Sequence, residues 1–388
     1  MRVTFSEIVK DLLAKRKATR NNRKAYFEAP EIEKPIVFCY NTINQREALK
    51  PLIAAFAEKA ETIGENPDFF PNQPDISYYH RLSLQYSVDL IRWYYTLKGY
   101  HKKVFRSRYY NFHLRLGQFR HLLSIFNKSK NLRYYIASND HSGMSQVGFV
   151  AAKKAGIKTI YVQHASVSDK FPPLDVDYAL LEGEDAKSKY LAAGPTRAKI
   201  ELVGTMKYDP YLQRSELDIL GELIGVCLGI ECHDYDQNFA LCAELEKLKK
   251  PFSLRFHPAV SQSIRKRFSE AGWAFSQPEE ETALDFIMRC HTIVSGDSNI
   301  LLEAIILKRR PLYFASDGEG LDYYGFLKAG ILDTTHFRFE HVIIALGEDF
   351  DIASHRQSAK YFCDTINSPF EGRSTELAIK SLNKIIGI

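Results

Sequence analysis

The sequence predicts an α/β protein built from two Rossmann-like domains with a cleft between them. The chain of 388 residues is too long for one ordinary core and suits two α/β units. Short apolar runs alternate with helical segments, and this alternation occurs twice, with a junction near residue 210. We therefore expect an N-terminal domain over residues 1–210, a second domain over residues 211–353, and C-terminal helices over residues 354–388 that can cross back to the first domain.

Added helices are expected in the first domain, before its alternating part. Apolar residues recur at helical spacing over residues 5–16 and again over residues 77–128. Between them, residues 35–40 form an apolar run typical of a buried strand, and residues 45–63 have the composition of a helix. The alternation then predicts strands over residues 133–138, 159–162, 178–181 and 200–203, with helices over residues 143–155 and 185–193.

The second domain repeats this pattern after a loop around residues 208–214. Its predicted strands are residues 225–230, 252–256, 292–295 and 311–314, and its predicted helices are residues 237–249, 261–271 and 299–307. In a parallel sheet all strands end at the same edge, and ligands of open α/β sheets bind at that edge. Polar residues that follow the strands are therefore the candidates for a site.

The composition indicates a folded globular protein, with 45% hydrophobic and 26% charged residues. No apolar run reaches the roughly 20 residues that span a bilayer. The N-terminus carries acids inside its apolar stretch, unlike a signal peptide, so we expect a cytoplasmic protein. The cysteines have no CxxC spacing, which favours buried free thiols over disulfides or a metal site: Cys39, Cys227, Cys232, Cys242, Cys290 and Cys363.

A basic and aromatic block runs from Leu90 to Asn139. It contains eleven lysines and arginines and no Asp or Glu, although the whole chain has a net charge of only +5. Aromatic residues among basic ones can stack on nucleic-acid bases, but these recur at helical spacing, which favours packing in a core. We expect a basic face that meets an anionic glycan, a lipid-linked glycan acceptor or anionic lipids at the inner membrane face, formed by Lys102, Lys103, Arg106, Arg108 and Arg115.

The strongest local signal lies at two strand ends of the second domain. A helix that opens after a tight turn directs backbone N–H groups at a phosphate, and a histidine nearby can contact the same group. A carboxylate one helical turn further on can accept from ribose hydroxyls. The alternative is that the serine or the aspartate only caps the helix and that the histidine is structural. The residues are His257 and Pro258, then Ser295, Gly296, Asp297, Ser298 and Asn299, then Glu303.

Strand ends of the first domain carry candidates for a general base. Transfer to a hydroxyl needs a group that takes its proton, and Asp140 and His164 follow two successive predicted strands. Glu182 follows the next strand and is held as a further candidate. The alternatives are that Asp140 is a turn or cap residue and that the acids around Glu182 favour a helix start.

This ordered set resembles the C-terminal half of GT-B glycosyltransferases: His257-Pro258, then Ser-Gly-Asp-Ser-Asn with Glu303, then Lys308-Arg309-Arg310-Pro311 before a strand. It is most similar to bacterial capsule enzymes of the polysialyltransferase-like and CDP-glycerol glycerophosphotransferase-like families, over roughly residues 134–332. The resemblance implies that His257 binds the donor phosphate, that Ser298 and Asn299 contact phosphate at the helix end, and that Glu303 meets the ribose.

The resulting prediction is a GT-B-like inverting glycosyltransferase that moves a sugar from a nucleotide donor to a bacterial surface glycan. A CMP-activated acidic sugar such as a nonulosonic acid is the first choice of donor. No metal and no other cofactor is expected, because a helix end can stabilise the departing phosphate. The alternatives are a CDP-glycerol-type polyol-phosphate transferase, a UDP-sugar 2-epimerase-like isomerase, and a non-catalytic module that binds anionic polymers; nucleic acid is the least favoured partner.

Overall fold

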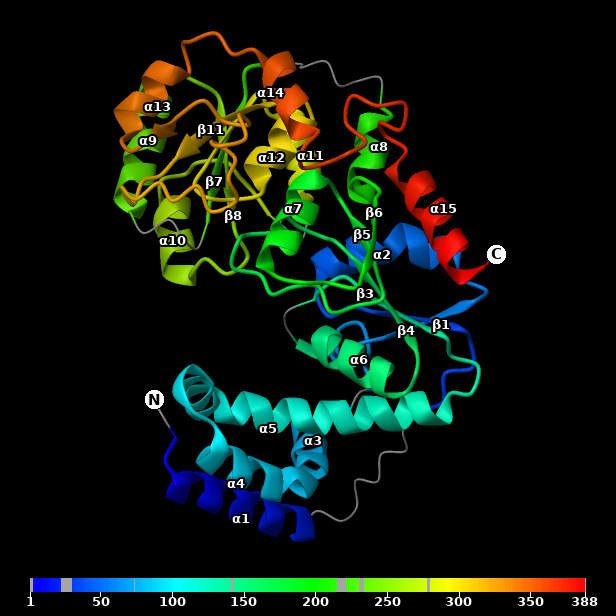
Figure 1. The fold of residues 1–388 in the computed structure, drawn as a ribbon. Helices are drawn as coiled ribbons and strands as arrows, with labels where there is room; N and C mark the ends of the chain where they lie inside the picture. Colours follow the sequence, from blue (N-terminus) through cyan, green and yellow to red (C-terminus); the bar gives the residue numbers. More distant parts are fainter. Residues whose placement is uncertain are drawn as a thin grey trace.

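The computed structural model describes residues 3–21, 30–72, 74–140, 143–214, 221–229, 234–277 and 280–387. It contains two six-stranded sheets in which all paired neighbours are parallel, as the alternation of strands and helices predicts. The two sheets lie in separate lobes, and a layer of helices lies at the end of the N-terminal lobe that is remote from the C-terminal lobe (Figure 1).

The N-terminal sheet has the strand order β2-β1-β3-β4-β5-β6. Its strands are β1 (Ile36–Cys39), β2 (Ala60–Ile63), β3 (Tyr134–Ala137), β4 (Lys158–Val162), β5 (Tyr178–Leu181) and β6 (Lys199–Leu202), with helices α2 (Ile43–Ala55), α6 (Gly143–Lys154) and α7 (Glu184–Ala193). The helix predicted over residues 45–63 is wrong at its end. Ala60–Ile63 instead pairs with β1 at the sheet edge, because pairing with a buried neighbour outweighs the local preference of a four-residue segment.

The C-terminal sheet has the strand order β12-β11-β10-β7-β8-β9. The sequence predicts its four long strands, but not the two-residue edge strands β9 and β12, which are too short to carry a periodic signal. Residue 230, at the end of the strand predicted over 225–230, lies outside the described residues. The strands are β7 (Ile224–Leu228), β8 (Phe252–Phe256), β9 (Phe275–Ser276), β10 (Thr292–Ser295), β11 (Arg310–Phe314) and β12 (Thr335–His336).

Short helices surround this second sheet and lead back to the first. After β6 come the 3-10 turn η2 (Met206–Tyr208) and α8 (Asp209–Leu212). The sheet is flanked by α9 (Tyr235–Lys247), α10 (Gln262–Glu270), α11 (Ala283–Arg289), α12 (Ile300–Ile306), α13 (Phe339–Ala345) and α14 (Ile352–Ala359), and the last helix is α15 (Ser374–Ile386).

Helix α15 packs on the N-terminal sheet, where Ala378 and Leu382 are buried in one cluster with Ile36 of β1. The carboxylate of Asp209 fixes the start of this helix, because it accepts the backbone N–H groups of Ser374 at 2.9 Å and of Thr375 at 2.6 Å. The chain therefore crosses from the second lobe back to the first.

The added helices form a layer with its own small core. The layer comprises α1 (Phe5–Asn21), α3 (Ile76–Ser83), η1 (Leu84–Tyr86), α4 (Ser87–Thr96) and α5 (Gly99–Lys128), with a break in the helical backbone of α5 at Arg108. Phe105 and Tyr109 of α5 are buried there against α1 and α4. The expectation that the aromatics of this block pack in a core is wrong for three of them, since Tyr95, Tyr100 and Tyr110 are 59%, 75% and 55% exposed.

The described part of the chain agrees with the sequence in the state of its cysteines. The five described cysteines are free and buried; Cys232 lies outside the described residues. Within those residues, no group of three or more His, Cys, Asp or Glu side chains could hold a metal ion. No described helix is long and apolar enough to cross a membrane.

Candidate functional site in the interdomain cleft

The carboxyl-end loops of the two sheets meet at one seam. The hydroxyl of Ser166, after β4, donates to Oδ1 of Asn299, which precedes α12 in the other lobe. The hydroxyl of Ser168 donates to the Tyr323 hydroxyl at 3.1 Å. Because ligands of open parallel sheets bind at this edge, the seam is the candidate site.

On the C-terminal side, His257 follows β8 and is exposed. Its Nδ1 accepts the backbone N–H of Ala259 at 3.1 Å, so the neutral imidazole carries its proton on Nε2 and can donate from there. Arg265 holds this turn, because its Nη2 donates to the carbonyl oxygens of His257 at 2.9 Å and of Pro258 at 3.1 Å. The turn thus presents a fixed imidazole donor at the sheet edge.

Side-chain hydrogen bonds of Ser295 and Asp297 hold the turn after β10. Ser295 is buried and its hydroxyl donates to the Cys227 carbonyl at 3.4 Å. Both carboxylate oxygens of Asp297 accept hydrogen bonds, from the Tyr313 hydroxyl at 2.7 Å and from the Tyr323 backbone N–H at 3.1 Å. Asp297 therefore fixes the turn and does not cap the helix.

The helix that follows this turn, α12, has only seven residues, so its dipole is weaker than that of the longer helix the sequence implied. Ser298 Oγ accepts the Ile300 N–H at 3.5 Å, whereas Asn299 makes no side-chain capping bond. A Cβ at Gly296 would meet only the Phe314 carbonyl oxygen, at 3.7 Å, so the space above this glycine is open to a ligand.

The strand order places His257 and Gly296 two strands apart. Strand β7 lies between β8 and β10. Neighbouring strands are about 4.8 Å apart, so the two turns are separated by roughly 10 Å along the edge. The His257 side chain is long enough to extend from its turn into this space. The distance that then remains between its ring and the Gly296 turn suits a diphosphate chain.

Glu303 lies where the sequence places it, one turn into α12, but its carboxylate is engaged across the seam. Oε1 accepts from Lys207 Nζ at 2.6 Å and from Asn299 Nδ2 at 3.2 Å. Lys207 belongs to η2, in the segment that follows the N-terminal sheet. Burial alone would lower the pKa of Lys207, but the Glu303 and Glu182 carboxylates hold that pKa above its usual value.

Sequence reasoning missed Lys207. The only local signal is its position three residues after Gly204, a glycine with φ of +70° that turns the chain at the end of β6. This is a weak signal, because a lysine after a strand is usually a solvated surface residue. Lys207 could be recognised only in the folded structure, where Glu303 of the second lobe lies beside its amine.

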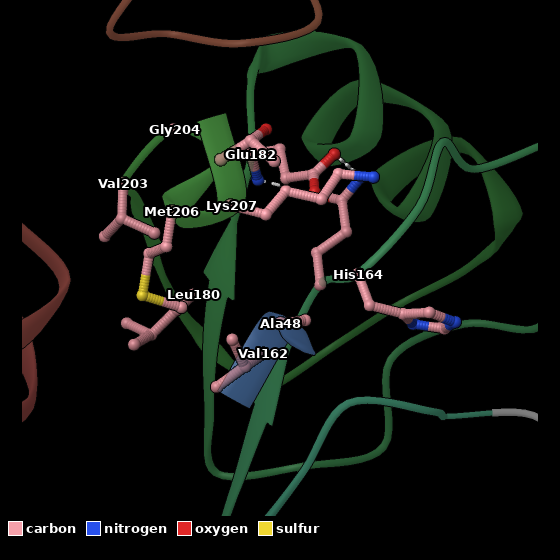
Figure 2. Close-up of a pocket in the computed structure, with 11 residues that line it drawn as sticks. Ala48, Val162, His164, Leu180, Glu182, Val203, Gly204, Met206 and Lys207 are labelled. Carbon is pink, nitrogen blue, oxygen red and sulfur yellow. Dashed lines mark hydrogen bonds between the residues drawn. The ribbon is translucent and has the colours of Figure 1, made fainter. Parts of the chain in front are cut away.

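Glu182 lies buried beside Lys207 on the wall of a small pocket at the end of β4 and β5 (Figure 2). Its backbone N–H donates to Gln163 Oε1 at 2.9 Å, and Gln163 Nε2 donates to Glu182 Oε2 at 3.3 Å. Burial raises the pKa of the Glu182 carboxyl to about 7, with Lys207 opposing the rise and Glu303 adding to it. Helix α7 is capped by Gly183, so Glu182 is not its cap.

The other two base candidates follow neighbouring strands, Asp140 after β3 and His164 after β4. His164 is half-buried and lines the same pocket as Glu182 and Lys207, and in Figure 2 its imidazole points away from both of them. Asp140 does not line this pocket, and its Oδ2 accepts the Tyr190 hydroxyl at 2.7 Å. The structure therefore brings together His164, Glu182 and Lys207.

The predicted basic face is divided in the structure. Lys103 and Arg108 are exposed on α5. Lys102 and Arg106 each lie 5.7 Å from the centre of the Tyr94 ring, where they shield an aromatic side chain. The structure pairs Arg115 with Glu65, which follows β2, at 3.4 Å. This arginine therefore joins the layer to the N-terminal sheet and adds little to a free basic face.

Comparisons with known proteins support the architecture. No protein-family model matches the chain, and no curated protein matches its sequence. Among solved structures, UDP-GlcNAc 2-epimerase from Neisseria meningitidis bound to UDP-GlcNAc is similar, with a TM-score of 0.56 and 13% identity over 90% of this chain and 99% of that one.

Two other solved structures have the same arrangement. The wall teichoic acid polymerase TagF gives a TM-score of 0.55 with 12% identity over 99% of both chains. CalG4, the calicheamicin glycosyltransferase, gives 0.51 with 10% identity over 92% of this chain and 99% of that one. At these identities the likeness concerns the fold alone, and the fold is the predicted GT-B-like pair of Rossmann-like domains.

Proposed function

We propose that this protein is a nucleotide-dependent transferase, first a glycosyltransferase, that moves a sugar or a polyol-phosphate group across the cleft between its two lobes. The observation that carries the proposal is the meeting of the two carboxyl-end edges, where His257 and the Gly296 turn lie on one side and His164 on the other. Such a seam can hold a donor on one edge and an acceptor hydroxyl on the other.

The donor phosphates would lie between the turns after β8 and β10. Nε2–H of His257 and the backbone around Gly296 supply donors to the phosphate oxygens, where negative charge grows as the bond to the transferred group breaks. We propose, as the sequence predicts, that this reaction needs no metal ion. Glu303 is assigned to positioning, because it holds Lys207 and Asn299 instead of standing free for a ribose.

We assign His164 as the general base for the acceptor hydroxyl. It is half-buried at the carboxyl end of β4, where its ring is partly accessible to an acceptor hydroxyl. A direct displacement then inverts the configuration, with the hydroxyl proton passing to the imidazole as the new bond forms and the nucleotide leaving. Glu182 lies beside this base, and Asp140 remains the alternative base.

For the donor, the sequence gives a CMP-activated acidic sugar as first choice and a CDP-linked polyol as the alternative. The separation of roughly 10 Å between the two turns favours a donor with two phosphates over one with a single phosphate. We therefore place a nucleoside diphosphate donor first. The acceptor is proposed to be an anionic surface glycan, free or lipid-linked, that approaches from the helical layer with Lys103 and Arg108.

A donor panel tests the proposal. The purified protein is incubated with CMP-, CDP- and UDP-linked donors, and nucleotide release is followed with and without an acceptor glycan. We expect release from at least one donor and faster release with acceptor. Consumption of no donor, with no nucleotide raising the Tm, would contradict transfer; the anionic-polymer module then remains. Epimerisation of UDP-GlcNAc without acceptor would select the isomerase.

A further inference from the structure

A second cavity opens beside the turn after β10 that contains Gly296, here called the donor turn, on the side opposite to His257. It has a volume of about 240 Å³. Its walls come from the carboxyl-end loops of β10 and β11, and Lys170 of the N-terminal lobe reaches it across the seam. The cavity thus belongs mainly to the C-terminal lobe, and the N-terminal lobe adds Lys170 to its lining.

The strand order places this cavity next to the proposed position of the donor phosphates. Along the edge the strands follow as β8, β7, β10 and β11. If the nucleotide phosphates lie between the turns after β8 and β10, the next space along the edge belongs to the group attached beyond the last phosphate. Gly296 lines this cavity and also belongs to the donor turn, so the two spaces are continuous.

The lining carries more negative than positive charge. The lining includes three acids, Asp297, Asp317 and Glu319, and one cation, Lys170. Both carboxylate oxygens of Asp297 accept hydrogen bonds, from Tyr313 and Tyr323. Asp317 Oδ1 accepts the Glu319 backbone N–H at 3.1 Å, and Glu319 is exposed. Lys170 Nζ lies 5.3 Å from the centre of the Tyr323 ring, which holds the single cation against an aromatic face.

Apolar surface completes the lining. The side chain of Leu321 is 67% exposed and that of Tyr323 is 36% exposed at the rim. Carboxylates accept hydrogen bonds from hydroxyl groups, whereas a second carboxylate in the same space would meet repulsion from both acids. Apolar faces with a few carboxylates suit a ring or chain that carries many hydroxyls.

We propose that this cavity receives the sugar or polyol portion of the donor beyond its last phosphate. We infer that it selects an uncharged polyhydroxy portion, a neutral sugar or a polyol, against one that bears a carboxylate. The inference rests on the proposed function and specifies its substrate class. Under this proposal, donors with a neutral sugar or polyol are preferred to the acidic-sugar donor that the sequence favours.

Matched donor pairs test this selection. UDP-glucose is compared with UDP-glucuronic acid, and CDP-glycerol with CDP-glycerate, by calorimetric titration into the full chain, with UDP, CDP and CMP as references. One repulsive contact near a protein surface is worth about a tenfold change in affinity, so the carboxylated member is expected to bind about tenfold or more weakly. CMP-linked N-acetylneuraminic acid is expected to bind no better than CMP.

The variant Asp317→Asn with Glu319→Gln keeps the size of both side chains and removes their charge. The difference within each pair is expected to shrink to about threefold or less. Glu348→Gln with Asp349→Asn, two exposed acids of the same lobe outside the cavity, should leave the difference unchanged. Equal affinity of the two donors within each pair, or an equal effect of the two double variants on that difference, would overturn the proposed selection but not the proposed transfer. If no nucleotide binds at all, both proposals are overturned.

Discussion

The Nζ of Lys207 lies 2.6 Å from Oε1 of Glu303, and this ion pair joins the segment after the N-terminal sheet to helix α12 of the C-terminal lobe. Both side chains are largely buried, and Glu182 lies close enough to act on the same amine. Two carboxylates thus enclose one cation at the centre of the seam.

Removal of this cation is expected to destabilise the protein strongly. Lys207→Met leaves two buried carboxylates without their partner, which costs about 3–5 kcal/mol in the free energy of unfolding. Thermal unfolding at neutral pH measures the loss. Lys247→Met is the matched control, because the Lys247 side chain is 73% exposed in its pair with Glu244 and its loss should cost less than about 1 kcal/mol. A loss for Lys207→Met as small as that of the control would show that the pair contributes nothing to the seam.

Glu182 gives stability a specific pH dependence. Its pKa in the folded protein is about 7, above the ordinary value of 4.5, so the folded state binds the proton more tightly than the unfolded state. The resulting stabilisation is complete below about pH 4.5 and is lost as the pH rises through about 7, to an extent on the order of 3 kcal/mol.

Glu182→Gln should remove this dependence, so the variant gains stability relative to the wild type between pH 5 and pH 8. Urea unfolding at several pH values measures it. Glu184→Gln, an exposed neighbour in α7, is the control and should keep the wild-type slope. Parallel curves for the wild type and Glu182→Gln would show that Glu182 is ionised throughout this range.

His257→Ala is expected to reduce turnover by about 10²–10³-fold, the range typical for loss of one donor to developing charge. Its side chain is exposed, so the Tm should change little. Nucleotide release by the donor panel provides the readout. His341→Ala, another exposed histidine of the same lobe, serves as control. Near-normal turnover in His257→Ala would remove this residue from the donor site.

We expect the exposed basic and aromatic residues of the helical layer to bind an anionic acceptor or an anionic membrane surface. Tyr95 and Tyr100 are exposed near Lys103 and Arg108 in a segment without acids, and aromatic side chains among cations suit an anionic interface. Charge reversal by Lys103→Glu with Arg108→Glu should weaken sedimentation with vesicles of phosphatidylglycerol and phosphatidylcholine about tenfold at low salt.

Nucleotide binding by this variant should be unchanged, since the layer lies at the end remote from the C-terminal lobe (Figure 1). Lys249→Glu with Lys250→Glu is the control for charge alone. If the wild type does not sediment but binds anionic glycan, the surface serves the acceptor; equal loss of vesicle and nucleotide binding would mean that the layer is only structural.

The candidate site was partly accessible from the sequence. The strand ends before His257, Gly296 and His164 could be recognised because polar or turn-forming residues follow a short run rich in apolar residues. The partners that complete them, Lys207 and Tyr323, stand in segments with no periodic pattern. Their place at the seam depends on how the lobes approach each other.

The sequence by itself determined the architecture, because the repeated alternation of apolar strands and helices leaves two parallel sheets as the arrangement that buries them. Tertiary structure decided the rest. It turned Glu303 from a free carboxylate into the partner of Lys207, gave Arg115 a partner in Glu65, and formed the cavity between Lys170 and Asp317. The physical reason is that charge, burial and shape at the seam arise between residues far apart in the chain, and local patterns carry no information about such pairs.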